Sequence, residues 1–177
     1  MSRERGTRSQ GAGDRTSRGT AVLAVAVLVA ALLAGAALLL ARGHDDRPGV
    51  SSYSGVDPDV YAAELLVAAD AAHTAAGLPA WRDAPCVGDL ARDRARALVG
   101  DHLTHAPLED VLAACVPLTT AAENLSRGAA PAAEVVEAWQ RSPGHRANLE
   151  DPTLTHARAG CVHDGDELVC SLVLVGP

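Results

Sequence analysis

Residues 135–152 read VVEAWQRSPGHRANLEDP, the most distinctive pattern of this sequence. Apolar residues at helical spacing in its first half predict an amphipathic helix that begins near Pro131. We expect this helix to end at Ser142-Pro143-Gly144, because Pro and Gly interrupt helical hydrogen bonding. His145 and Asn148 come directly after, and local structure alone does not require polar side chains at these two positions.

The other predicted elements place helices first and strands last. Three helices are expected before the quoted stretch, at residues 58–76, 87–99 and 108–115. In the second of these, charged residues are assigned to the solvent-facing side: Asp89, Arg92, Asp93, Arg94 and Arg96. Two strands are expected at residues 159–162 and 168–175, around the turn Asp164-Gly165-Asp166. This order predicts an α+β domain with segregated layers.

An uncharged run, AVLAVAVLVAALLAGAALLLA, occupies residues 21–41. As a helix, at about 1.5 Å per residue, it is roughly as long as the hydrocarbon core of a bilayer is thick. Residues 1–20 are rich in arginine, whereas aspartates lie beyond the run, so the positive-inside rule predicts a cytoplasmic N-terminus. We therefore expect a single-pass protein of the cytoplasmic membrane, with residues 43–177 on the outer side. Two alternatives remain open: a buried core helix, and a signal peptide cleaved at Ala34-Gly35-Ala36.

The remainder of the chain is expected to be a linker, residues 42–57, and then one domain at residues 58–177. The linker is rich in Gly, Ser, Asp and Pro, which is typical of a flexible segment. Beyond residue 42 the chain carries nine arginines against 20 acidic residues. Nucleic-acid binding depends on Lys and Arg that neutralise phosphates, so this charge excludes a nucleic-acid partner. With no Phe, two Trp and two Tyr, the core must consist of Ala, Val and Leu.

All four cysteines lie beyond the predicted anchor, at positions 86, 115, 161 and 170. They allow three pairings. A hairpin that closes on a four-residue loop, residues 164–167, places Cys161 opposite Cys170 and leaves Cys86 to pair with Cys115. An oxidising compartment favours these two disulfides. Free buried thiols are the alternative.

Two further segments combine polar groups in the same way as the quoted stretch. One is the loop from His102 to His105, and the other is Glu123-Asn124, between apolar neighbours. These two segments, Gly77-Leu78-Pro79 and the quoted stretch follow one another in a characteristic order and spacing. In this the chain resembles the CAP superfamily of cysteine-rich secretory, antigen 5 and pathogenesis-related proteins. The similarity is to its bacterial form with an SPGHR motif, and it covers about residues 58–176.

The resemblance implies a three-layer α-β-α sandwich with a cavity on one face. In many members two histidines and one or two glutamates line that cavity and hold a divalent metal such as zinc. Carried over by position, these residues are His105, Glu123 and His145, and the second glutamate falls at Ser142. Two imidazoles and one carboxylate form a minimal zinc set. The expected cofactor is thus none, or a zinc-like metal held by the two histidines.

Catalysis is a second use of these three residues, with Glu123 as general base and the histidines as acid or electrophile. We expect further cavity residues at four positions: His102, Asn124, Ser142 and Asn148. Structural alternatives stay open for three residues. Glu123 would cap backbone N–H groups before a turn, His145 would join the helix at Trp139 to the next segment of the chain, and Asn148 would bond the backbone around the SPGHR turn.

The resemblance and the predicted anchor together suggest three functions. The first is a non-enzymatic module on the outer face of the membrane that binds an envelope lipid, glycan or protein. The second is a metal-assisted hydrolase of envelope peptide or glycan. The third is a structural envelope component in which the histidines have no chemical task.

Overall fold

A computed structural model describes residues 52–177, and within them four strands form one sheet in the order β1-β3-β4-β2. The strands are β1 (Arg82–Asp83), β2 (Thr120–Gly128), β3 (His156–Asp164) and β4 (Glu167–Gly176). β3 and β4 form the expected terminal hairpin, whose turn contains Gly165 at φ 63°. β2 pairs antiparallel with β4, and the short β1 pairs parallel with β3. β2 is therefore an edge strand.

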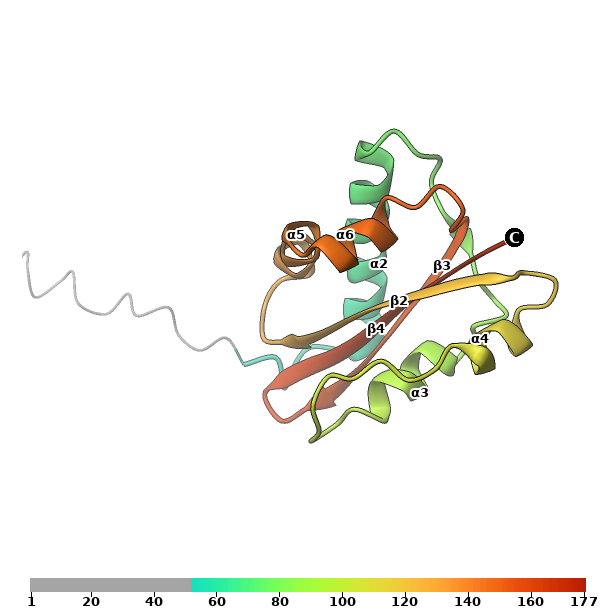
Figure 1. The fold of residues 1–177 in the computed structure, drawn as a ribbon. Helices are drawn as coiled ribbons and strands as arrows, with labels where there is room; N and C mark the ends of the chain where they lie inside the picture. Colours follow the sequence, from blue (N-terminus) through green and yellow to red (C-terminus); the bar gives the residue numbers. More distant parts are fainter. Residues whose placement is uncertain (1–51) are drawn as a thin grey trace, which may run out of the picture. The chain divides into compact units, whose positions relative to one another are not determined.

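Helices cover both faces of this sheet (Figure 1). They are α2 (Pro58–Ala75), α3 (Leu90–Arg96), α4 (Glu109–Ala114), α5 (Ala132–Arg141) and α6 (Pro143–Leu149). Two features favour the start of α2 at Pro58. The Asp57 carboxylate caps the helix by accepting a hydrogen bond from the Asp59 N–H at 2.8 Å, and proline at the first helical position already has a helical φ. α2, α5 and α6 lie on one face of the sheet, and α3 and α4 lie on the other (Figure 1). The three-layer arrangement that the family resemblance implies is confirmed.

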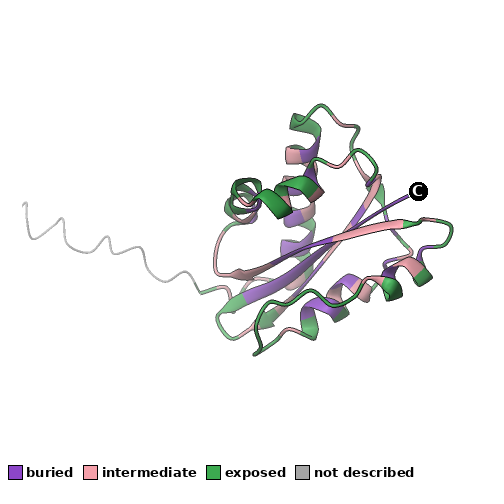
Figure 2. Cartoon of the chain, in the orientation of Figure 1, coloured by how far each residue is buried: buried purple, intermediate pink, exposed green. Residues whose placement is uncertain are grey.

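The core lies on both sides of β4, whose residues from Leu168 to Val175 are all buried (Figure 2). Leu172 and Leu174 pack toward α2 and α5, whereas Val173 and Val175 pack toward α3 and α4. A strand with both faces covered needs apolar residues at successive positions, which explains the continuous run LVCSLVLV. Ser171 is the polar exception, and its hydroxyl is bonded to the Glu123 carboxylate.

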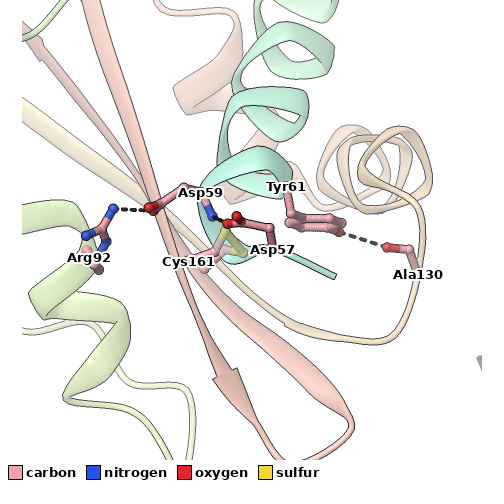
Figure 3. The surroundings of a disulfide bond; sticks show 7 residues. Asp57, Asp59, Tyr61, Arg92, Ala130 and Cys161 are labelled. Atoms are coloured by element: carbon pink, nitrogen blue, oxygen red, sulfur yellow. Dashed lines mark hydrogen bonds and ion pairs between the residues drawn. A yellow bond between two sulfur atoms is a disulfide. The ribbon is translucent and has the colours of Figure 1, made fainter. Parts of the chain in front are cut away.

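Both expected disulfides are present, and no described cysteine is free. Cys86–Cys115 joins the segment before α3 to the end of α4. Cys161–Cys170 links β3 to β4 at directly opposed positions, as predicted, although Asp164 pairs with Glu167 and the loop is therefore two residues long instead of four. Figure 3 shows the surroundings of Cys161, where Asp59 of α2 pairs with Arg92 of α3.

Two expectations about local structure are wrong, and one helix was not expected. Residues 120–128 form β2, so Glu123 lies within a strand and does not precede a turn. The SPG sequence ends α5, but Pro143 also begins α6, because proline at the first helical position loses no hydrogen bond. The helix expected at residues 87–99 is the shorter α3, and its Arg94, assigned to the solvent side, is only 7% exposed.

The predicted anchor, residues 21–41, and the segment before it lie outside the described residues. None of the described helices is long and apolar enough to span a membrane. The end of the expected linker contacts the domain. The Tyr53 N–H donates to the Asp166 carbonyl at 2.8 Å, and the Tyr53 ring meets the edge of Tyr61 with centroids 5.7 Å apart.

Candidate functional site

Glu123 is a buried carboxylate on β2, and it lies at the centre of a hydrogen-bond network. Its Oε1 accepts from Arg94 Nε and from the Ser171 hydroxyl, each at 2.7 Å. Its Oε2 contacts His105 Nδ1 at 2.9 Å and accepts from Arg94 Nη2 at 3.2 Å. Burial alone would raise the pKa of Glu123, but the hydrogen bonds from Arg94, His105 and Ser171 outweigh it and lower the pKa. The carboxylate is therefore ionised, and each of its two oxygens makes two hydrogen bonds.

Arg94 extends this network to the segment before α4. Its Nη1 donates to the Pro107 carbonyl at 3.0 Å and to the Asp110 carboxylate at 3.1 Å, and its Nη2 donates to the Ala106 carbonyl at 2.9 Å. With the two bonds to Glu123, every N–H of the guanidinium has an acceptor. The hydrogen bond to Glu123 is the main reason that the pKa of Arg94 is raised. Arg94 thus holds the segment from Ala106 to Asp110 against β2.

The two candidate histidines are held in different ways. His105 lies on the loop after α3, with 54% of its side chain exposed, and its Nδ1 faces Glu123. Because Nδ1 faces the carboxylate, Nε2 faces away from Glu123. His145 lies on α6, with its ring centroid 6.3 Å from that of Trp139. Burial, and to a smaller extent the nearby His105, lowers the pKa of His145, so this imidazole is neutral at pH 7.

A pair of amides joins α6 to β2. Asn124 Nδ2 donates to the His145 carbonyl at 3.1 Å, and Asn124 Oδ1 accepts from Asn148 Nδ2 at 2.9 Å. Asn148 also donates to the Glu123 carbonyl at 3.3 Å. The expectation that Asn148 bonds the backbone of the SPGHR turn is therefore wrong, because its partners lie on β2. This pair places His145 beside the strand that carries Glu123.

A groove with a volume of about 790 Å³ lies beside these residues, between β2 and α5. Its lining includes apolar side chains from three segments: Leu103, Leu125, Val135, Ala138 and Trp139. Polar residues also line it: Ser126, Arg127, Glu134, Glu137, Arg141, Ser142 and His145. Glu123 borders a second cavity of about 260 Å³, on the α3 side of the sheet, together with Arg94 and Thr104.

The predicted residues therefore separate into three groups. His105 and Glu123 are in direct contact, and His145 is held next to them through Asn124 and Asn148. Ser142 and His145 line the groove, but within residues 52–177 no hydrogen bond joins the Ser142 hydroxyl to His145. His102 is exposed, its backbone N–H donates to the Asp101 carboxylate at 2.8 Å, and among the described residues no hydrogen bond joins its ring to the cluster.

The donor set does not fit a three-ligand zinc centre. A catalytic zinc is usually held by three protein side chains. Both oxygens of Glu123 are already engaged by Arg94, Ser171 and His105, which leaves two imidazoles. In the described part of the chain, no three His, Cys, Asp or Glu side chains are grouped so that they could hold a metal ion.

Sequence reasoning missed Arg94 and Ser171, which both bind Glu123. Arg94 had a detectable signal, because helical spacing places it on the same face as Ala91, Ala95 and Leu98. A charged residue inside an apolar stripe is rarely buried without a partner. Ser171 had no such signal, since one hydroxyl in a run of apolar strand residues does not reveal which carboxylate it faces.

Comparisons with known proteins agree with this architecture. The chain matches the family model of the cysteine-rich secretory protein family, CAP, over residues 47–174. It is 46% identical over 46 residues to the uncharacterized protein YkwD of Bacillus subtilis strain 168, a stretch that spans 26% of this chain and 18% of that relative.

Three solved structures share the fold. An extracellular protein from Bacillus anthracis that contains an SCP domain has a TM-score of 0.59 at 17% identity, over 68% of this chain and 41% of that one. A cysteine-rich secretory protein from Staphylococcus aureus has a TM-score of 0.59 at 14% identity, over 69% and 40%. An outer surface protein from Borrelia burgdorferi has a TM-score of 0.60 at 19% identity, over 68% and 95%. The family match covers most of the chain and agrees with its fold, so this protein belongs to the cysteine-rich secretory protein (CAP) family.

Proposed function

We propose that this protein is a binding module displayed outside the cytoplasmic membrane, with residues 21–41 as its single membrane anchor and residues 1–20 on the cytoplasmic side. The length of the apolar run and the arginines before it support this orientation. Two disulfides suit an oxidising compartment. Relatives of the same fold include a protein described as extracellular and one described as an outer surface protein.

The groove between β2 and α5 carries this proposal. Its volume of about 790 Å³ lies within the range of roughly 300–1,000 Å³ that is usual for ligand sites. Its apolar lining, which includes Val135 and Trp139, supplies contact area, and the polar groups of Ser142 and His145 would orient a ligand. An envelope lipid, glycan or polypeptide is the ligand expected outside the membrane.

The state of Glu123 supports binding without catalysis. A general base needs a free lone pair that points at the substrate, and a metal ligand needs an oxygen that no other cation holds. Arg94 donates to both oxygens of Glu123, at 2.7 and 3.2 Å. The carboxylate therefore serves to position His105 and the loop that carries it.

A hydrolase is the second candidate, and one observation favours it. The contact between Glu123 and His105 is a carboxylate–imidazole pair of the kind that orients a catalytic histidine, and His145 lies next to it. Such an enzyme would use His105 as its base and would not require a metal. Release of peptide or sugar from peptidoglycan by the wild type, abolished in His105→Ala, would establish it.

A blocked groove tests the binding proposal. The full chain in detergent micelles is titrated with phospholipid micelles, soluble muropeptides and peptide pools, and binding is measured by nuclear magnetic resonance (NMR) of the Trp139 indole N–H. Ala138→Phe fills the groove and should abolish the response, whereas Ala133→Phe, on an exposed position of α5 outside the groove, should preserve it. If no probe shifts the indole signal, or if both variants respond like the wild type, the binding proposal is wrong and a structural role is favoured.

A further inference from the structure

We propose that the groove takes an extended polypeptide, which adds a strand to the free edge of β2. This inference rests on the proposed function, because it names the ligand class of the same groove. It depends on the direction of the backbone groups of β2, on which of those groups have partners, and on the charge around the groove.

The pairing of the sheet sets the direction of each backbone group. The Ala157 carbonyl accepts from the Ala84 N–H beside β1, so odd-numbered residues of β3 face β1 and even-numbered ones face β4. Gly160 lies opposite Ser171, which makes the even-numbered residues of β4 face β2. Asn124 in turn lies opposite Leu172. Even-numbered residues of β2 therefore bond to β4, and the backbone groups of its odd-numbered residues point away from the sheet.

Side chains from α5 and α6 satisfy only part of this free edge. Trp139 Nε1 donates to the Leu125 carbonyl at 3.0 Å, and Asn148 donates to the Glu123 carbonyl at 3.3 Å, which agrees with the outward direction of both groups. Between residues 52 and 177, the Leu125 N–H and both backbone groups of Arg127 have no hydrogen-bond partner. Leu125 and Arg127 both line the groove. Unpaired backbone groups next to an apolar lining are a template for another strand.

The segment between α3 and α4 lies on the α3 side of the sheet (Figure 1), where it contacts β2. It contacts β2 through side chains only. Arg127 Nη1 donates to the Asp101 carbonyl at 2.6 Å, and His105 contacts Glu123 at 2.9 Å. Within the described residues, no backbone hydrogen bond joins this segment to β2. The Arg127 side chain is directed to this segment and to Asp164, which leaves the backbone of Arg127 open to the groove.

The charges around the groove favour a polypeptide with a basic side chain. Arg127 is paired with Asp164 at 3.0 Å, and Arg141 lies 3.7 Å from Glu137. Glu134 forms no ion pair with any described residue. The groove therefore has one uncompensated negative charge, at the start of α5. A polypeptide complements both features, because its backbone bonds the edge of β2 and an arginine or lysine faces Glu134. An acyl chain complements neither.

Amide hydrogen exchange tests the inference on the wild-type chain in detergent micelles. The probe is a pool of hexapeptides that have one fixed arginine and random residues elsewhere. At saturation, exchange at the Arg127 amide should slow at least about tenfold, because this residue is half-buried and its N–H has no partner among the described residues before a strand is added. Exchange at Ser126, whose N–H already faces β4, should not change. An unchanged exchange rate at Arg127 overturns the inference.

Two variants at one position separate the backbone from the side chain. Arg127→Ala removes the side chain and keeps the outward N–H, whereas Arg127→Pro removes both; proline is tolerated on a strand edge where its N–H is not in the ladder. Relative to Arg127→Ala, Arg127→Pro should weaken binding of the pool about tenfold, as expected for loss of one well-formed hydrogen bond. Equal affinities for the two variants would overturn the inference, and the wild-type exchange experiment decides it if Arg127→Pro does not fold.

The same experiments distinguish this inference from the proposed function. If the peptide pool does not bind while lipid or muropeptide binds and Ala138→Phe prevents it, the binding module stands and strand addition is wrong. If no probe binds at all, both are wrong.

Discussion

Replacing Arg94 by methionine tests the network around Glu123. Only 6% of the Arg94 side chain and 2% of the Glu123 side chain are exposed, so water does not screen this pair. Methionine fills similar space but leaves a buried carboxylate without its cation. Removing one partner of a buried ion pair costs about 3–5 kcal/mol. That is a large share of the roughly 5–15 kcal/mol by which such domains are stable.

The loss should depend on pH in a defined direction. The pKa of Glu123 is lowered in the folded wild type, so the pair stabilises the fold above the ordinary glutamate pKa of about 4.3. This stabilisation disappears as the pH falls through the lowered pKa. In Arg94→Met the guanidinium no longer offsets burial, and the pKa of Glu123 rises. The deficit of the variant is therefore full at pH 7 and shrinks as the pH falls toward the lowered pKa of the wild type.

Urea unfolding monitored by tryptophan fluorescence measures this loss, since both tryptophans lie in the domain. Arg96→Met is the matched control, because Arg96 is on the same helix, is 60% exposed and, among residues 52–177, pairs only with exposed Asp93. It should change the free energy of unfolding by less than about 1 kcal/mol. A cost below about 1 kcal/mol for Arg94→Met, or a deficit that does not change with pH, would refute the buried-pair account.

Three further predictions concern the supports of the site. Asn148→Ala should lower the free energy of unfolding by about 1–3 kcal/mol, because buried Asn124 loses a hydrogen-bond donor. Urea unfolding measures this loss, with exposed Gln140→Ala as the control. Gly160→Ala should lower the free energy of unfolding by about 1–3 kcal/mol or more, because a Cβ there would lie 2.3 Å from the backbone nitrogen of Arg92. Gly144→Ala, which has open space around it, should lower it far less in the same assay. His105→Ala should raise the pKa of His145, because nearby His105 is, after burial, the second group that lowers this pKa, whereas distant His163→Ala should leave it unchanged. Histidine NMR titration measures both variants, and an unchanged pKa of His145 in His105→Ala would contradict this prediction.

The terminal hairpin was predictable because turn length and register are coupled. A turn centred on Gly165 and Asp166 fixes which residues oppose each other, and that placed Cys161 opposite Cys170 without any tertiary information. The first half of α5 was predictable for a similar reason, since its apolar residues repeat at helical spacing. Both features depend on local sequence alone.

β2 was not predictable in this way. Its sequence, TAAENLSRG, is rich in Ala, Glu, Asn and Gly, which are depleted in strands. It becomes a strand because nine residues pair with β4, and that pairing is set by the whole domain. The partners of Glu123 are equally non-local, since Arg94 lies 29 residues before it and Ser171 lies 48 residues after it. Family resemblance pointed to Glu123, His105 and His145 as candidate site residues, but it gave no indication that the Arg94 guanidinium bonds both oxygens of Glu123.

A zinc titration tests most directly whether Glu123 serves Arg94 or a metal, and so whether this protein is a binding module or a metal-dependent enzyme. Thermal unfolding of the wild type, Glu123→Gln and His145→Ala is measured with and without zinc. We predict no zinc-dependent stabilisation that requires Glu123. Zinc that raises the free energy of unfolding of the wild type by about 2.7 kcal/mol, as a ligand does at roughly 100 times its Kd, and that has no effect on either variant would contradict this account.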